Sequence, residues 1–488
     1  MSSDSLQKRT IRGLGWSVID NLSGSGITFL VGIVLARILS PIEFGVIGIL
    51  SIFIAIANSI VDCGFSNALI RKQDVTEEDY NTVFYINLAL GGLMYLLLFF
   101  FAPWLARFFC SPILGPTLRI MSIVLFFNAL SMVQKTKMTK CMDFKTQAKI
   151  SIMASLISAA VGIGMALKDF GVWALVGQQL SRQFCNMSFL WFFSQWKPKL
   201  LYSWSSFREL FSFGSKLLVS GLIDTIYQNL YQFVIGKFYT KENLGQYTRA
   251  QQFQAIFSSN LTAVIQKVTY PALSLIQNDA HRLSLGYRKI IKYSMAVSSG
   301  TLVGLAVVAK PLLFFLIGEK WLPAVGYLQI ICFSGMLYPL HAINLNILQV
   351  RGRSDLFLRL EIVKKIIASL TILVGIFCGV YALLIGSVVA SWFSFFLNAH
   401  YSGVLINYSV ISQLKDIFPP ILISLVAWGI GWLFTFTSIS HIVTLLIQLV
   451  VGGGLLIFLY YFFCREIFDG LKTVLYNLLP AGHKSMIK

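Results

Sequence analysis

The 488-residue chain is poor in charge: only 12% of its residues are Asp, Glu, Lys or Arg, whereas 56% are hydrophobic. Soluble domains carry about 25% charged residues. No polar stretch is long enough to form a separate soluble domain. This composition excludes a soluble fold and predicts an all-α polytopic membrane protein.

The chain also lacks the motifs of common enzymes and metal proteins. Its seven cysteines include no CxxC pair, its five histidines are dispersed, and no phosphate-binding P-loop occurs. Disulfide frameworks, zinc sites and built-in ATPases depend on such patterns. We therefore expect no enzymatic activity, no cofactor and no bound metal.

A cleavable signal peptide is not recognisable either. Residues 1–12 are polar, and the apolar stretch Gly13–Arg37 that follows has no small-residue cleavage site. We expect it to remain as the first membrane span. Asp20, Asn21 and Thr28 fall on one side of this helix, so that side is expected to line protein or water.

Long apolar segments are abundant and predict about fourteen transmembrane helices. Their expected positions are 13–36, 42–62, 81–103, 116–134, 148–167, 171–194, 211–236, 250–275, 289–309, 324–347, 359–378, 380–401, 417–436 and 441–463. Most of the 39 Lys and Arg residues lie in alternate connections if the N-terminus is inside, which predicts two cytoplasmic termini. The net charge of +19 then reflects contact with anionic membrane lipids, not nucleic acid. The basic loop from Lys135 to Lys149 is expected to face lipid headgroups; the alternative is that it docks the anionic head of a lipid carrier.

Three pairs of similar segments occur in the same order in the two halves of the chain. They are Arg37–Gly45 with Lys237–Gly245, Ala102–Leu105 with Lys310–Leu313, and Gly171–Leu175 with Gly379–Leu383. Such a pattern predicts two parallel repeats of six helices followed by two extra helices. The expected parts are an N-lobe (1–195), an interfacial linker helix (196–210), a C-lobe (211–402) and the last two helices with the tail (403–488).

Polar side chains recur on single faces of several spans: Asn58 shares a face with Asp62 in the span 42–62, and Lys216, Asp224 and Gln228 belong to one stripe in the span 211–236. Ionisable groups in a span cost at least about 2.5–3.5 kcal/mol, so they should face protein or water. We predict a hydrated cavity whose cations and amides bind an anionic, hydroxyl-rich cargo. The candidates are Arg182, Lys216, Arg249, Lys267, Gln178, Gln228, Gln252 and Asn260. Asp20, Asp62 and Asp224 could form ion pairs or bind a coupling cation. The alternative for all of these residues is that they hold the helices together by interhelical hydrogen bonds and ion pairs.

Several segments resemble those of bacterial polysaccharide transporters. They are RGLGW in the first span, LARILSPIEFG after it, the DCGFSNALIRKQDVTEEDYNTVFYIN connection, GVWALVGQQL, and LQVRGRSDLFLRLEIVKK. The chain is similar to the lipid-linked oligosaccharide flippases that export O-antigen, colanic acid and teichuronic acid. These belong to the multidrug/oligosaccharidyl-lipid/polysaccharide exporter superfamily.

The resemblance implies a V-shaped pair of six-helix lobes with alternating access, in the bacterial cytoplasmic (inner) membrane. The implied cargo is an undecaprenyl-pyrophosphate-linked repeat unit, and the implied partners are membrane lipids and polysaccharide polymerase machinery. A multidrug/cation antiporter of the same superfamily is the first alternative, although it would favour acids in the cavity with few balancing cations. A membrane polysaccharide polymerase or ligase is the second, although it would need a long outer loop.

Overall fold

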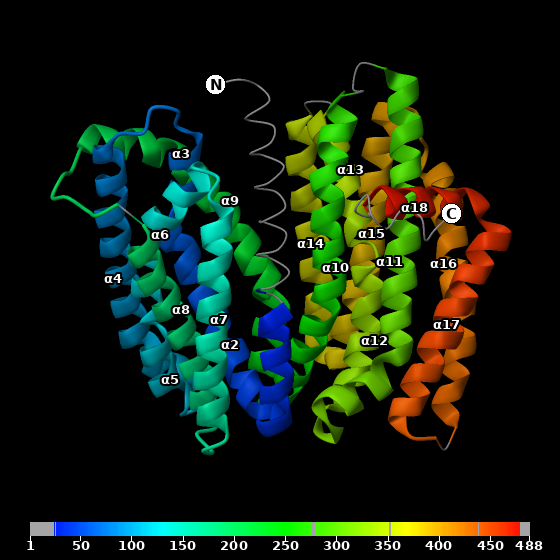
Figure 1. The fold of residues 1–488 in the computed structure, drawn as a ribbon, viewed down its shortest axis with the longest axis horizontal. Helices are drawn as coiled ribbons and strands as arrows, with labels where there is room; N and C mark the ends of the chain where they lie inside the picture. The colour runs from blue at the N-terminus through cyan, green and yellow to red at the C-terminus, as the bar shows by residue number, and fades with distance from the viewer. Residues whose placement is uncertain are drawn as a thin grey trace. The chain divides into compact units, whose positions relative to one another are not determined.

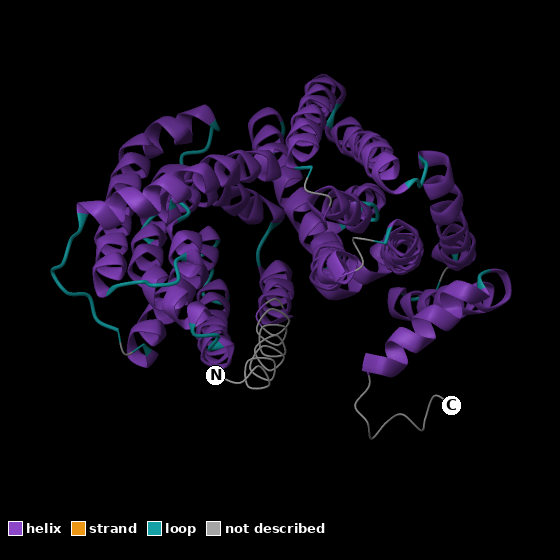
Figure 2. Ribbon diagram, turned by 90° about the horizontal axis from the view of Figure 1, so that it is seen from above, coloured by secondary structure: helices purple, strands orange, loops and turns teal. Residues whose placement is uncertain are grey.

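The computed structural model describes residues 24, 26–194, 196–275, 279–350, 353–437 and 439–478. Over these residues the regular structure is helical, and short loops join the helices (Figure 2). The chain divides into two compact units, Met1–Thr248 and Arg249–Lys488. The predicted all-α fold is confirmed.

Nine helices within the described residues are long and apolar enough to cross a membrane. A shorter apolar helix, Gly26–Ile38, falls in the first predicted span. Every later predicted span coincides with a helix or with two consecutive helices. The chain is therefore a multi-pass membrane protein, and the count of fourteen spans stays a prediction.

Within its described residues, the first unit contains the helix Gly26–Ile38, eight further helices and the beginning of another (Figure 1). The labelled helices are α2 (Pro41–Asp62), α3 (Phe65–Arg71), α4 (Glu77–Phe108), α5 (Leu114–Met121), α6 (Val124–Lys140), α7 (Phe144–Ala166), α8 (Val172–Phe193), α9 (Trp204–Phe238) and the start of α10 (Lys241–Leu275). Helix α2 packs against α4, α6, α8 and α9, so it is central to this unit.

The second unit continues α10 and then adds the remaining helices. They are α11 (Ala280–Ile317), η1 (Glu319–Trp321), α12 (Pro323–Gly335), α13 (Tyr338–Val350), α14 (Ser354–Cys378), α15 (Val380–Ile406), α16 (Val410–Trp432), η2 (Leu433–Phe436), α17 (His441–Phe463) and α18 (Arg465–Leu478). Helix α11 packs against α12, α13, α16 and α17 and is central to this unit.

The start of α2 follows directly from its sequence. Ser40 is the N-cap residue, Pro41 occupies the first helical turn, and the Glu43 carboxylate accepts hydrogen bonds from the Ser40 backbone N–H at 2.6 Å and its hydroxyl at 3.0 Å. Proline has no N–H to lose there, and this reciprocal capping satisfies donors that the helix leaves unpaired. The helix ends at Cys63 and Gly64, which both adopt a left-handed backbone conformation.

The linker between α8 and α9 differs from the predicted interfacial helix at 196–210. Residues 196–203 are not helical, and α9 begins only at Trp204 after the N-cap Ser203. Pro198 disfavours a helix at the residue before it. The backbone N–H groups of Lys199 and Ser203 donate instead to the side chains of Asn81 and Thr82 on α4. These tertiary hydrogen bonds replace the helical ones.

In the second unit, a buried carboxylate ties α16 to α11. Asp416 is 7% exposed and accepts two hydrogen bonds from the Arg288 guanidinium and one from the Tyr408 hydroxyl. Lys292 Nζ lies 3.5 Å from the same carboxylate. The charge of Asp416 is therefore balanced where the two helices meet.

Candidate cargo-binding cavity

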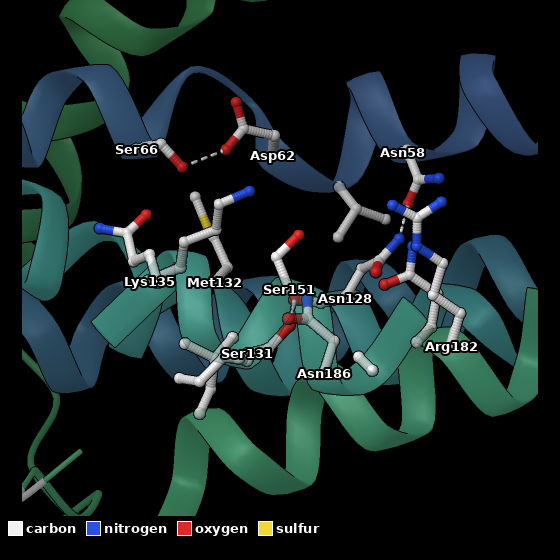
Figure 3. A pocket seen from close by; sticks show the side chains of 16 residues that line it. Asn58, Asp62, Ser66, Asn128, Ser131, Met132, Lys135, Ser151, Arg182 and Asn186 are labelled. Atoms are coloured by element: carbon white, nitrogen blue, oxygen red, sulfur yellow. Dashed lines mark hydrogen bonds between the residues drawn. The ribbon is translucent and has the colours of Figure 1, made fainter. Parts of the chain in front are cut away.

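A cavity of about 580 Å³ lies in the first unit, between α2, α6, α7 and α8 (Figure 3). Its walls are mainly hydroxyl, amide and charged side chains, although α2, α6 and α7 belong to segments apolar enough to cross a membrane. Ionisable groups in a membrane-spanning helix are costly unless they face protein or water. The cavity is therefore a place where these helices can hold a polar ligand.

The guanidinium of Arg182 lies at one end of the cavity, near Asn58 and Asn128 (Figure 3). Its Nη1 donates to the Thr28 hydroxyl at 3.0 Å. Asn128 Nδ2 donates to Asn58 Oδ1 at 2.7 Å and so links α6 to α2. The hydrogen bond to Thr28 orients the guanidinium, whose planar set of donors suits phosphate oxygens.

Asp62, Ser66 and Lys135 lie toward the other end (Figure 3). The Ser66 hydroxyl donates to Asp62 Oδ1 at 2.6 Å. Asp62 is the last residue of α2, and Ser66 lies in α3 after the left-handed turn at Cys63 and Gly64. This turn lets both residues line the same cavity.

The cavity combines two cations with one carboxylate, and several uncharged hydrogen-bonding side chains lie among them. The amides and hydroxyls are Asn58, Asn128, Gln147, Gln183, Asn186, Ser66, Ser131 and Ser151. Cations bind phosphate oxygens, whereas amides both donate to and accept from sugar hydroxyls. The lining therefore suits a ligand with phosphate and sugar groups.

Two residues predicted from helical faces, Arg182 and Asp62, are brought together in this cavity. Gln178 is on α8 as expected, but it packs against Gly162 of α7, where a Cβ would approach the Gln178 side chain within 2.8 Å. Gln178 is not one of the residues that line the cavity. Its predicted contact with cargo has no support from this geometry.

The polar stripe predicted on α9 does not line this cavity. Lys216, Asp224 and Gln228 have exposed side chains, and the cavity between α2, α6, α7 and α8 does not include them. Lys216 forms no hydrogen bond or ion pair with another described residue, whereas Asp224 has a partner. Their role in cargo binding or cation coupling stays a prediction.

Three candidates lie on α10 in the second unit. Arg249 is 4% exposed, donates to Gln252 Oε1, and its guanidinium lies 5.8 Å from the centre of the Trp321 ring. Asn260 donates to the Ile256 carbonyl oxygen at 2.8 Å. These contacts agree with the alternative that such residues hold the helices together. The Lys267 side chain and Asp20 lie outside the described residues.

The sequence predictions missed the contributions of α6 and α7. Asn128, Ser131, Lys135 and Gln147 all line the cavity. The first three recur with a spacing that places them on one face of a helix, a signal that was available in the sequence. Lys135 was expected to face lipid headgroups with its loop. It belongs instead to α6, which continues to Lys140, and it lines the cavity.

Comparisons with known proteins agree with these features. The model of the family described as polysaccharide biosynthesis protein matches residues 34–326. The succinoglycan biosynthesis transport protein ExoT of Rhizobium meliloti is 27% identical over 333 residues, which cover 68% of this chain and 67% of ExoT. The lipopolysaccharide biosynthesis protein WzxC of Escherichia coli is 23% identical over 373 residues, 76% of each chain.

Among solved structures, the inward closed conformation of the lipid II flippase MurJ has a similar fold. The TM-score is 0.74 at 14% sequence identity, and the match covers 91% of this chain and 98% of MurJ. At this identity the likeness is evidence for the fold alone.

Proposed function

Because the chain belongs to the polysaccharide biosynthesis protein family, we propose that it is a flippase for lipid-linked oligosaccharides. Its cargo would be a repeat unit linked to undecaprenyl pyrophosphate, which it carries across the cytoplasmic membrane for surface polysaccharide synthesis. Relatives named as transport or biosynthesis proteins for succinoglycan and lipopolysaccharide support this assignment.

The observation that carries the proposal is the cavity between α2, α6, α7 and α8. It places Arg182 and Lys135 among amide and hydroxyl side chains, and three of the helices around it, α2, α6 and α7, belong to segments apolar enough to cross a membrane. A pyrophosphate-linked sugar needs cations for its phosphates and hydrogen-bonding groups for its hydroxyls. An apolar or amphipathic cation would instead favour acids and aromatic rings, whereas Asp62 is the single acid lining the described cavity.

Transport would proceed by alternating access, with the sugar head inside the protein and the lipid tail in the bilayer. The functional parts would be the N-lobe (1–195), the linker (196–210), the C-lobe (211–402) and the C-terminal part (403–488). Both termini would be cytoplasmic, since Lys and Arg concentrate in the connections on that side. Such a transporter carries out no covalent chemistry on its cargo.

The test is a deletion of the gene in its own host. We expect loss of the surface polysaccharide and accumulation of lipid-linked repeat units on the cytoplasmic side, both reversed by the wild-type gene. Unchanged polysaccharide together with increased sensitivity to cationic drugs would instead support a multidrug antiporter. Accumulation of single exported repeat units that fail to polymerise would support a polymerase.

A further inference from the structure

A second cavity, of about 650 Å³, lies in the first unit where the chain passes from α8 to α9. It is lined by the end of α8, the N-cap residue of α7, and residues of α4, α6 and the non-helical linker. The linker runs beside the start of α4 (Figure 1). The cavity therefore lies where these helices begin or end, and it shares no lining residue with the cavity that contains Asn58 and Arg182.

The linker is held firmly against α4. The Trp196 side chain is 4% exposed, its indole N–H donates to Glu77 Oε2 at 2.9 Å, and its ring packs against Tyr80 and Phe84. The two backbone hydrogen bonds to Asn81 and Thr82 continue this attachment. The cavity wall formed by the linker is thus ordered before any ligand arrives.

Two lysines that line the cavity form no ion pair with another described residue. Lys197 and Lys199 are exposed, and neither ammonium group pairs with another described residue. Both acids in the lining are already engaged. Glu77 contacts Trp196 and lies 3.6 Å from Lys137 Nζ, and Asp143 accepts the backbone N–H of Thr146 as the N-cap of α7. The charged groups of the cavity that remain available to a ligand are therefore the two ammonium groups.

Large apolar and aromatic side chains flank these lysines in the chain. Phe192 is 82% exposed, Leu200 is 93% exposed, and Tyr202 and Trp204 are also exposed. In a membrane protein such side chains are buried in the interfacial and acyl regions of the bilayer. A ligand in the cavity would therefore have its charged group beside the lysines and an apolar part beside Phe192 and Leu200.

We propose that this cavity binds the phosphodiester headgroup of an anionic membrane phospholipid. Lys197 and Lys199 contact the phosphate, while Phe192, Leu200 and Trp204 lie among the acyl chains. The apolar flank favours a bilayer lipid over free phosphate. The site is separate from the cargo cavity and would anchor the linker between the two six-helix repeats at the membrane surface.

The experiment measures lipid preference by electron paramagnetic resonance. The purified full chain is reconstituted in phosphatidylcholine vesicles that contain either spin-labelled phosphatidylglycerol or spin-labelled phosphatidylcholine. We expect a preference for phosphatidylglycerol in the wild type. In Lys197→Gln/Lys199→Gln this preference should fall by at least about fivefold, the factor that one lysine contributes at an anionic membrane surface.

Two matched variants separate site binding from net charge and folding. Lys197→Arg/Lys199→Arg keeps the charges and should keep the preference. Lys168→Gln/Lys310→Gln removes two exposed lysines that belong to neither the cavity nor the basic loop, and it should also keep the preference. Wild-type preference in the Lys197→Gln/Lys199→Gln variant, or an equal loss in the Lys168→Gln/Lys310→Gln variant, would overturn the proposal. Displacement of phosphatidylglycerol by inorganic phosphate or by undecaprenyl pyrophosphate would overturn it as well, because the site would then serve phosphate or cargo.

Discussion

Gly45 and Gly245, which occupy equivalent positions in the two copies of the repeated segment, each face the backbone of the other copy. A Cβ at Gly45 would overlap the carbonyl oxygen of Lys241, and a Cβ at Gly245 would overlap that of Pro41. The start of α2 and the start of α10 therefore cross at a distance that glycine alone permits. The repeat places both glycines at one helix contact in the first unit.

Substitution of either glycine should separate these helices. We expect Gly45→Ala and Gly245→Ala each to lower the free energy of unfolding by about 1–3 kcal/mol, the usual cost of overpacking a close contact. The measurement is thermal denaturation of the purified protein in mild detergent. Gly164→Ala on α7 is the control, because a Cβ there meets no atom within 4 Å. Equal melting temperatures for Gly45→Ala and Gly164→Ala would contradict the close crossing.

Removal of the Arg182 guanidinium should impair export. Charge-assisted hydrogen bonds contribute about 1.5–3 kcal/mol, so Arg182→Ala should reduce surface polysaccharide about tenfold or more at equal protein level. Arg182→Lys keeps a cation without the planar donor set and should retain part of the activity. Arg107→Ala removes an exposed arginine at the end of α4 and serves as the control. Full export by Arg182→Ala would exclude Arg182 from cargo binding.

The carboxylate of Asp416 should be important for the stability of the second unit. Asp416→Asn removes the carboxylate that half-exposed Arg288 shares with Lys292, which keeps Glu466 as a partner. We expect a loss of about 1.5–3 kcal/mol, the range for a hydrogen bond to a charged group. The matched control is Asp469→Asn. Asp469 lies 3.8 Å from Arg465 and both side chains are exposed, so this substitution should lower the free energy of unfolding by less than about 1 kcal/mol. Thermal denaturation followed by tryptophan fluorescence compares them. Similar stability of both variants would show that the ion pairs of Asp416 add little to the stability of this unit.

The attachment of the linker to α4 should protect it from proteolysis. Asn81→Ala removes the acceptor for the Lys199 backbone N–H and should speed tryptic cleavage between Lys199 and Leu200 about fivefold, as expected for the loss of one hydrogen bond of about 1 kcal/mol. Asn229→Ala is the control, because the Asn229 side chain donates to the Thr225 carbonyl oxygen within α9. An unchanged cleavage rate in Asn81→Ala would mean that other contacts hold the linker.

Much of the fold could be predicted because hydropathy and periodicity depend on local sequence. The positions of the apolar segments predicted where the helices lie, whereas the division into two six-helix repeats stays a prediction. The linker could not be predicted in the same way. Its aromatic and basic residues resemble those of an interfacial helix. However, its backbone N–H groups donate hydrogen bonds to the side chains of Asn81 and Thr82, which are distant in sequence.

The candidate site could be predicted in part for a similar reason. A helical wheel shows which residues share a face, and it grouped Asn58 with Asp62 on one span and found Arg182 on another. It does not show which faces meet in space. The α9 stripe, with Lys216 and Gln228, has the same polar pattern as the cavity-lining faces but does not line the described cavity.

The most direct test of the central claim is transport by the purified chain alone. The protein is reconstituted in sealed liposomes that contain a lipid-linked oligosaccharide with a fluorescent sugar, and a membrane-impermeant reductant quenches the label in the outer leaflet. We expect wild-type protein to make the inner-leaflet label accessible to the reductant much faster than empty liposomes or the Arg182→Ala variant do. Equal quenching in wild-type and empty liposomes, under an imposed ion gradient and without one, would contradict the assignment as a flippase.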